Sequence, residues 1–201
     1  MTTHIVGGGI GAVVLAMAIF ISISHNDPWS LVGGIVYGMS MIALYAVSSV
    51  YHGLPGSHAK RIMRIIDHCT IYLLIAGTYT PILLAAIRPL YPSLAWTVFG
   101  CEWGFAALGA ALTAIDLKKY AKFSMLCYLA MGWFIILVLR QTVETISLAG
   151  FMWLLAGGVA YTVGAVLYGV GKKKRYIHSV FHIFVDVGSI LQAVCILRYV
   201  L

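Results

Sequence analysis

Seven long apolar runs, joined by short turn segments, make up almost the whole chain. Each run is close to the roughly 20 residues that an α-helix needs to cross the hydrocarbon core of a bilayer. Of the 201 residues, 62% are hydrophobic and only 9% are charged, whereas a soluble domain would carry about a quarter charged residues. The runs are also too long and too uniformly apolar for the alternating strands of an outer-membrane barrel. The sequence therefore predicts an all-α integral membrane protein.

The runs predict seven transmembrane helices in a single domain over residues 1–201. Short breaks with turn-forming residues separate them, such as Asn26-Asp27-Pro28 and Pro55-Gly56. Connections this short leave no room for a second domain. The predicted spans are residues 5–24, 31–51, 65–87, 94–115, 123–139, 149–170 and 177–200.

Basic residues gather on one side of the predicted membrane. The side shared by the N-terminus and the second, fourth and sixth connections holds ten of the thirteen, namely Lys60, Arg61, Arg64, Lys118, Lys119, Lys122, Lys172, Lys173, Lys174 and Arg175. The other side holds Arg88, Arg140 and Arg198. Because cytoplasmic loops carry the excess of Lys and Arg, this bias predicts a cytoplasmic N-terminus and an extracytoplasmic C-terminus. Receptors coupled to G proteins run in the opposite direction.

The same basic residues decide which partners are expected. The net charge of +7 is concentrated at span ends, where Lys and Arg meet anionic lipid headgroups. We therefore expect membrane lipids as partners, with anionic headgroups at the basic cytoplasmic loops. We expect no nucleic acid and no obligate protein partner, in a multi-pass protein of the cell membrane. The four cysteines stand singly within apolar runs, so neither a disulfide framework nor a thiolate zinc site is indicated.

Three histidines lie near the cytoplasmic ends of predicted spans. His178 and His182 are four residues apart, and so share one face of the last helix, while His52 closes the second span. The predicted topology brings all three to one depth, although it does not say which helices are neighbours. Three imidazoles with an open fourth position are a common ligand set for catalytic Zn²⁺. A haem held by two histidines, or side chains that reach toward the headgroups, are the alternatives.

Polar residues beside these histidines suggest catalytic roles. Asp67 opens the third span at the same depth, and a carboxylate there can orient a water and accept its proton. Ser48 lies one helical turn before His52 and can hydrogen-bond the water or a substrate. His68 is about 100° around the helix from Asp67. We therefore expect Asp67 to face the metal and His68 to face a helix partner, and we count His68 and Asp186 as candidate hydrogen-bond partners that support the metal ligands.

Two acids lie deeper in the spans, where carboxyl groups usually serve a function. Asp186 is one turn beyond His182, so it is either an acceptor for a ligand imidazole or a carboxylic acid bonded to a neighbouring helix. Glu102 lies within the fourth span and has either a structural hydrogen bond or a place in the lining of a cavity.

Three stretches together resemble a known family. They are Ser-Ser-Val-Tyr-His-Gly at 48–53, Asp-His-Cys-Thr-Ile-Tyr-Leu-Leu-Ile-Ala-Gly-Thr-Tyr-Thr-Pro at 67–81 and His-Ser-Val-Phe-His at 178–182. In this order and on these spans, they resemble the bacterial hemolysin III proteins. These proteins are the prokaryotic branch of the progestin and adipoQ receptor (PAQR) family. The resemblance covers essentially the whole chain. One departure is at the start, where Thr3-His4 is recognisable but the acidic and amide residues that often precede it are missing.

The resemblance implies a seven-helix bundle with an intramembrane zinc ion near the cytoplasmic face. By match of motif, the ligands are His52, His178 and His182, with Asp67 next to the zinc-bound water and Ser48 as the motif serine. Related adiponectin receptors and alkaline ceramidases imply hydrolysis of a lipid amide. The bacterial branch is associated instead with membrane homeostasis, lipid composition and an old hemolysin label.

Three functions follow as hypotheses. The first is a zinc-dependent hydrolase that cleaves a lipid amide or ester. The second is a lipid sensor without enzymatic activity, in which zinc ties spans two, three and seven together. The third is a pore lined by Asp186 and Glu102. We rank the pore lowest, because two acids do not make a continuous polar path.

Overall fold

The computed structural model describes the backbone of residues 2–170 and 177–201 and the side chains of residues 4–169 and 180–201. Within these residues the chain is mostly helical, with short turns between the helices, and contains no strand. The seven α-helices are α1 (Thr2–Ser24), α2 (Pro28–Gly53), α3 (His58–Pro81), α4 (Pro92–Ile115), α5 (Ala121–Trp133), α6 (Leu139–Val170) and α7 (Ile177–Cys195). Short π- or 3₁₀-helical segments, η1 (Ile82–Ile87), η2 (Phe134–Val138) and η3 (Ile196–Val200), extend α3, α5 and α7.

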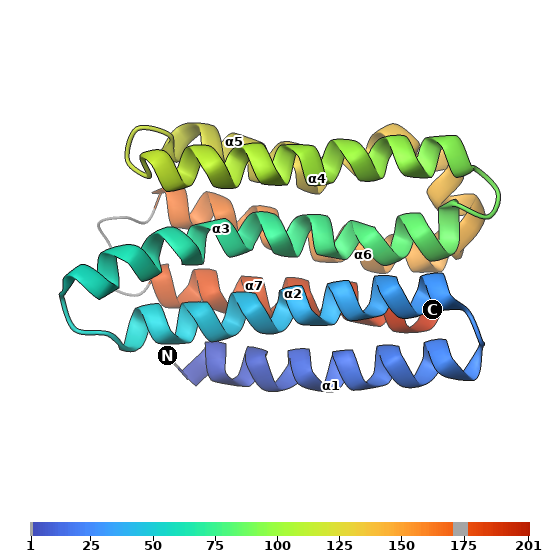
Figure 1. Cartoon of the computed structure of the whole chain (residues 1–201), viewed down its shortest axis with the longest axis horizontal. Helices are drawn as coiled ribbons and strands as arrows, with labels where there is room; N and C mark the ends of the chain where they lie inside the picture. Colours follow the sequence, from blue (N-terminus) through green and yellow to red (C-terminus); the bar gives the residue numbers. More distant parts are fainter. Residues whose placement is uncertain (1, 171–176) are drawn as a thin grey trace.

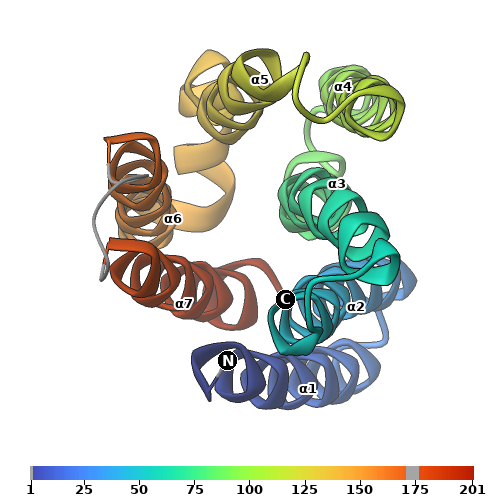
Figure 2. The ribbon, with the colours of Figure 1, turned by 90° about the vertical axis from the view of Figure 1, so that its left-hand side faces the viewer.

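The helices lie side by side as one bundle, and the two termini mark its opposite ends (Figure 1). Viewed from the end that holds the N-terminus, the helices form a ring (Figure 2). In this ring α1 lies beside α2 and α6 lies beside α7, in agreement with their contacts. Termini at opposite ends require an odd number of passes along the bundle.

Among the described residues, six helical stretches are long and apolar enough to cross a membrane, and one of them, Ala121–Gly169, is 49 residues long. This stretch is not one straight helix. Nε1 of Trp133 donates a hydrogen bond to Oγ1 of Thr162 at 3.0 Å, whereas 29 residues of straight helix would separate them by about 43 Å. The chain therefore reverses between them, and Ser147 interrupts the helical backbone there with φ 66°. The stretch makes two passes, along α5 and along α6.

The observed helices match the predicted spans at most ends and differ in two places. α3 begins at His58 rather than at residue 65, because Ser57 caps it by accepting a hydrogen bond from the backbone N–H of Lys60 at 3.2 Å. α6 begins at Leu139 rather than at residue 149, because a short helical piece precedes the break at Ser147.

Close approach between α1 and α2 depends on Gly7. A Cβ atom built on Gly7 overlaps the ring of Tyr45, whereas one built on Gly9 meets nothing within 4 Å. We expect Gly7→Ala to destabilise the protein by about 1–3 kcal/mol, the usual cost of overpacking. Gly9→Ala is the matched control and should be neutral or slightly stabilising, because alanine favours a helix. Thermal unfolding in detergent measures both, and equal midpoints would contradict the packing described for α1.

Asp27 caps the start of α2. Its Oδ1 accepts a hydrogen bond from the backbone N–H of Trp29 at 3.0 Å, and its Oδ2 accepts one from Oγ of Ser30 at 2.6 Å. Partial burial acts to raise the pKa of Asp27, but these hydrogen bonds outweigh it and lower the pKa. The ionised carboxyl therefore stabilises the folded chain above its ordinary pKa of about 3.9, and this gain is lost as the pH falls through the lower folded-state value.

Loss of this cap has a measurable cost. Asp27→Ala should destabilise the protein by about 1 kcal/mol at pH 7, and the difference from wild type should shrink in acid. Asp27→Asn keeps a capping oxygen and should cost less. Unfolding midpoints at neutral and acid pH test this, and an Asp27→Ala penalty that grows on acidification would show that the sign is wrong.

Candidate metal centre

A cavity of about 830 Å³ lies inside the bundle. Much of its wall is apolar and includes the buried side chains of Leu74, Ile82, Ile135 and Leu154. Its polar lining residues include the side chains His4, Ser48, His52, Asp67, His68 and His182. They come from the start of α1, the end of α2, the third turn of α3 and the second turn of α7, which meet toward one end of the bundle (Figure 1). The cavity therefore combines a polar end with apolar walls.

Three histidines form a cluster in this wall. His4, His52 and His182 each offer one ring nitrogen, and these nitrogens all lie within 4.8 Å of one another. The ring of His182 meets those of His4 and His52 edge-on, with centroids 4.0 Å and 5.1 Å away, while the rings of His4 and His52 are parallel with centroids 5.6 Å apart. His4 is 3% exposed and His182 is 7% exposed. The nitrogens thus converge in a place largely shielded from solvent.

The cluster fits Zn²⁺. Zinc binds imidazole nitrogen at about 2.0–2.1 Å and prefers a tetrahedral set, in which the nitrogens lie about 3.3 Å apart. Nitrogens within 4.8 Å of one another are close enough to share such an ion after the side chains adjust. Imidazoles also suit copper and nickel, so the donor set by itself does not specify the metal.

The predicted ligands are placed as follows. His52 and His182 meet in the structure, so α2 and α7 are close enough at this end to share an ion. The side chain of His178 lies outside the described residues. The backbone of α7 includes residue 178, one turn before His182. Its role as a ligand stays a prediction.

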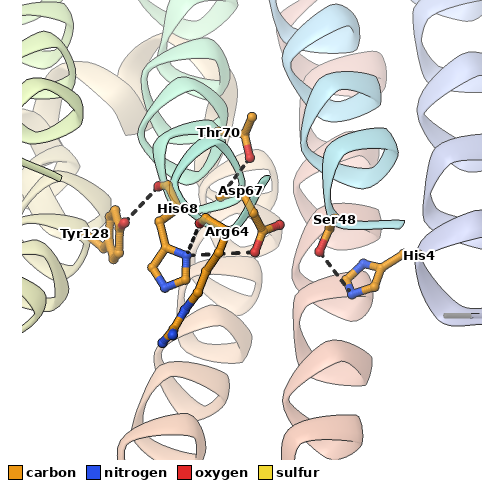
Figure 3. Close-up of polar contacts among 7 residues, drawn as sticks. All are labelled: His4, Ser48, Arg64, Asp67, His68, Thr70 and Tyr128. Atoms are coloured by element: carbon orange, nitrogen blue, oxygen red, sulfur yellow. Dashed lines mark hydrogen bonds and ion pairs between the residues drawn. The ribbon is translucent and has the colours of Figure 1, made fainter. Parts of the chain in front are cut away.

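Asp67 and Ser48 lie beside the cluster. Oγ of Ser48 is 3.4 Å from Nε2 of His4, and the Asp67 carboxyl lies near the same hydroxyl. Figure 3 draws Asp67, Ser48 and His4 in a row between α3 and α1. Oγ1 of Thr70 donates to the Asp67 carbonyl at 2.7 Å and supports this turn of α3. A carboxyl, a hydroxyl and the imidazoles are therefore in one wall of the cavity.

The prediction that the His68 ring faces a helix partner was wrong. Its Nδ1 lies 2.9 Å from the backbone carbonyl of Arg64, one turn earlier in α3, and 3.9 Å from Oδ2 of Asp67 (Figure 3). The ring bonds back along its own helix and lines the cavity. It is the backbone carbonyl of His68 that contacts a partner, by accepting a hydrogen bond from Tyr128 of α5 at 2.8 Å.

The two deeper acids are not among the cavity-lining side chains. Asp186 lies near the Tyr45 hydroxyl on α2, but its Oδ1 has no hydrogen-bond partner among the described residues, so its role stays a prediction. Glu102 is fully buried in α4, and neither of its oxygens has a hydrogen-bond partner among the described residues.

A hydroxyl cluster next to the centre holds α7 in place. Tyr45 of α2 donates to Oγ of Ser189 at 2.8 Å, and Tyr161 of α6 is 2.6 Å from the same oxygen. Ser189 is seven residues beyond His182, so it lies two turns away on the same side of α7. Two neighbouring helices thus fix the rotation of α7 that directs His182 toward the cluster.

His4 was not predicted as a ligand from the sequence. Thr3-His4 was noted only as the recognisable part of the N-terminal segment found in many members of the resembled family. The signal was nevertheless present, because His4 begins a span on the side that the sequence predicts to be cytoplasmic, as His182 does. His52 and His182 were grouped because they lie at one membrane depth, and His4 lies at the same depth. The candidate metal site therefore includes a residue of α1, whereas the sequence had predicted that it joins the second, third and seventh spans.

Cations also line the cavity at its polar end. Arg64 of α3, Lys118 and Lys122, the latter two near the start of α5, contribute to the wall and are exposed. Their charge suits an anionic group that enters from the headgroup region.

The family model and two bacterial relatives that match this chain all belong to the haemolysin-III group. A family model described as haemolysin-III related matches residues 1–193. The chain is 38% identical to "Hemolysin-3" of Bacillus cereus over 197 residues, covering 96% of this chain and 88% of that protein. It is 35% identical to "Hemolysin-3 homolog" of Bacillus subtilis, covering 98% and 91%. The human "Monocyte to macrophage differentiation factor" is 29% identical over 182 residues, covering 87% and 73%. No solved structure matches the chain.

Proposed function

The chain belongs to the haemolysin-III related family, and from this premise we propose that it is a zinc-dependent hydrolase of a lipid amide or ester that acts in membrane lipid homeostasis. It is a multi-pass protein of the cell membrane, as its apolar helices and its bacterial relatives indicate. One observation carries the proposal. A single cavity has apolar walls that suit an acyl chain, and a polar end with converging imidazoles, a carboxyl and a hydroxyl.

We further propose that the chain crosses the membrane seven times, with the N-terminus in the cytoplasm. Two observations support this topology. The chain reverses between Trp133 and Thr162, which divides the longest apolar stretch into two passes, and the termini lie at opposite ends of the bundle. The excess of basic residues at the end that holds the histidines then directs this end toward the cytoplasm.

Each polar residue at the end of the cavity has its own role in the proposed hydrolysis. Zinc held between His52 and His182, with His178 as the further ligand that the family resemblance implies, would polarise the carbonyl and make water a better nucleophile. Asp67 accepts the proton that the attacking water loses, and Ser48 donates a hydrogen bond to the substrate oxygen.

The remaining wall selects the substrate. The apolar side chains hold the acyl chain and exclude bulk water, which strengthens electrostatic interactions at the reacting bond. Arg64, Lys118 and Lys122 hold a headgroup of negative charge near the entrance.

A structural zinc site is the second candidate, and the histidine arrangement favours it in one respect. His4 adds a further imidazole to those that the family resemblance implies, and zinc sites closed by four protein ligands are typically structural. A pore has less support, because Glu102 and Asp186 are not among the residues that line the cavity.

Lipid hydrolysis separates these functions. Purified protein is incubated in vesicles with lipid amides and esters, and the release of fatty acid is followed by mass spectrometry. We expect release that stops after zinc is removed by a chelator and returns when zinc is restored. Zinc retained without release from any lipid would support the structural role instead. Release by the chelated, metal-free protein at the full rate would contradict the proposal.

A further inference from the structure

We propose that His4 is itself a ligand of the metal, so that one ion fastens the first helix, α1, to α2 and α7. This inference rests on the proposed metal site and goes beyond it, since the ligands implied by the family resemblance are His52, His178 and His182. If His178 also binds, four imidazoles close the site, which favours the structural role over hydrolysis. His4 would also be the one ligand in the chain's N-terminal segment, where this sequence departs from the family pattern.

The His4 ring lies close to the other two imidazoles. One of its nitrogens is within 4.8 Å of a ring nitrogen of both His52 and His182. The His4 ring meets the ring of His182 at a centroid distance of 4.0 Å, which is shorter than the 5.1 Å between the rings of His52 and His182. His4 therefore lies close enough to share an ion with His182, as His52 does.

The His4 side chain is also buried. A histidine in the first turn of a membrane helix can reach the headgroup region at little cost. His4 does the opposite, because it is only 3% exposed and lines the cavity. A buried ring on the cavity wall, with a nitrogen directed toward those of His52 and His182, is where a ligand to a shared ion would lie.

Residues of α2 hold the His4 ring in place. Oγ of Ser48 lies 3.4 Å from Nε2 of His4, and the Tyr45 ring lies 5.9 Å from the His4 ring. Tyr45 is also the side chain that packs on Gly7, one turn further along α1. The contacts that hold α1 against α2 thus set the position and orientation of His4, as residues that hydrogen-bond or pack against a ligand orient it in other metal sites.

The consequence is a link between distant parts of the chain. His4 and His182 are separated by nearly the whole sequence, and a ligand bond from each to one ion would join α1 to α7. Because metal binding then requires α1 to be docked, metal binding should stabilise the docked helix. Loss of the His4 donor should weaken metal binding and remove part of this stabilisation.

Two substitutions distinguish ligation from packing. His4→Ala removes the ring, and His4→Gln keeps a polar side chain that can hydrogen-bond Ser48 but is a poor metal donor. His58→Ala is the matched control, because His58 is an exposed histidine at the same end of the bundle. Zinc affinity is measured by competition with a chromophoric chelator, and unfolding midpoints are compared with and without zinc.

We expect His4→Ala and His4→Gln to bind zinc about 100-fold more weakly, at the upper end of the 10–100-fold that loss of a ligand's supporting partner costs. His58→Ala should match wild type. With bound Cu²⁺ as the probe, pulsed electron paramagnetic resonance counts coordinated imidazoles and should find one fewer in both His4 variants.

Different failures have different meanings. If wild type binds zinc but both His4 variants bind it with wild-type affinity and an unchanged imidazole count, His4 is not a ligand and this inference is overturned, while the proposed function stands. If the wild-type protein binds no metal, both are overturned. If His4→Ala fails to fold, the result for His4→Gln decides alone.

Discussion

His182→Ala protein purified without chelator should contain less than about a tenth of the zinc found in wild type. His182 is central to the cluster, because its ring lies edge-on to both His4 and His52. Zinc affinity depends on the number of donors that converge, so loss of the shared imidazole leaves the remaining donors on separate helices. Elemental analysis of the purified protein, expressed as zinc per chain, gives the result directly.

A matched histidine controls for nonspecific metal binding. His58→Ala removes an exposed histidine from the same end of the bundle and should retain the wild-type zinc content. Full zinc in His182→Ala would mean that the ion binds elsewhere. Equal losses in both variants would point to adventitious binding at the surface.

Asp67→Asn should lower the rate of lipid hydrolysis by about 10²–10⁴-fold, the range that a general base contributes, while zinc content stays unchanged. An amide is nearly the same size as a carboxyl and can keep the contact with Ser48, but it cannot accept a proton from water. Because Asp67 is not one of the histidine donors, metal binding should not require it.

Asp116→Asn is the control for this substitution. Asp116 is exposed at the end of α4, where its carboxyl accepts hydrogen bonds from the backbone N–H groups of Lys118 and Lys119 at 3.0 Å and 2.9 Å. Asparagine can accept them too, so activity should stay at the wild-type level. Undiminished fatty acid release by Asp67→Asn would remove its assigned role, and zinc loss in that variant would show that Asp67 supports the metal instead.

Much of the fold was predictable because bilayer thickness sets the length of each apolar run. The ends of α1 and α4, Ser24 and Ile115, coincide with the predicted ends of their spans. The start of α3 was not predictable in this way, because residues 58–64 are helical through the cap at Ser57 rather than through hydrophobicity. Likewise, the helix breaks at Ser147 because this residue has a positive φ of 66°. A glycine at this position would have predicted such a backbone conformation, but a serine does not.

The site was predictable in depth but not in lateral arrangement. Topology placed His52 and His182 at one level, and the structure brings their rings together. Only packing could reveal that α1 contributes His4, because hydropathy says nothing about which helices are neighbours. The His68 ring was misplaced for a local reason, since a hydrogen bond to the carbonyl of Arg64 competes with a partner on another helix.

The proposed function depends on one metal ion that is bound by imidazoles from separate helices. X-ray absorption at the zinc edge of wild-type protein purified without chelator tests this most directly. We predict about one zinc per chain, with a first shell of nitrogen and oxygen at about 2.0–2.1 Å and the multiple scattering typical of imidazole. Protein without zinc, or zinc with sulfur neighbours at about 2.3 Å, would contradict it.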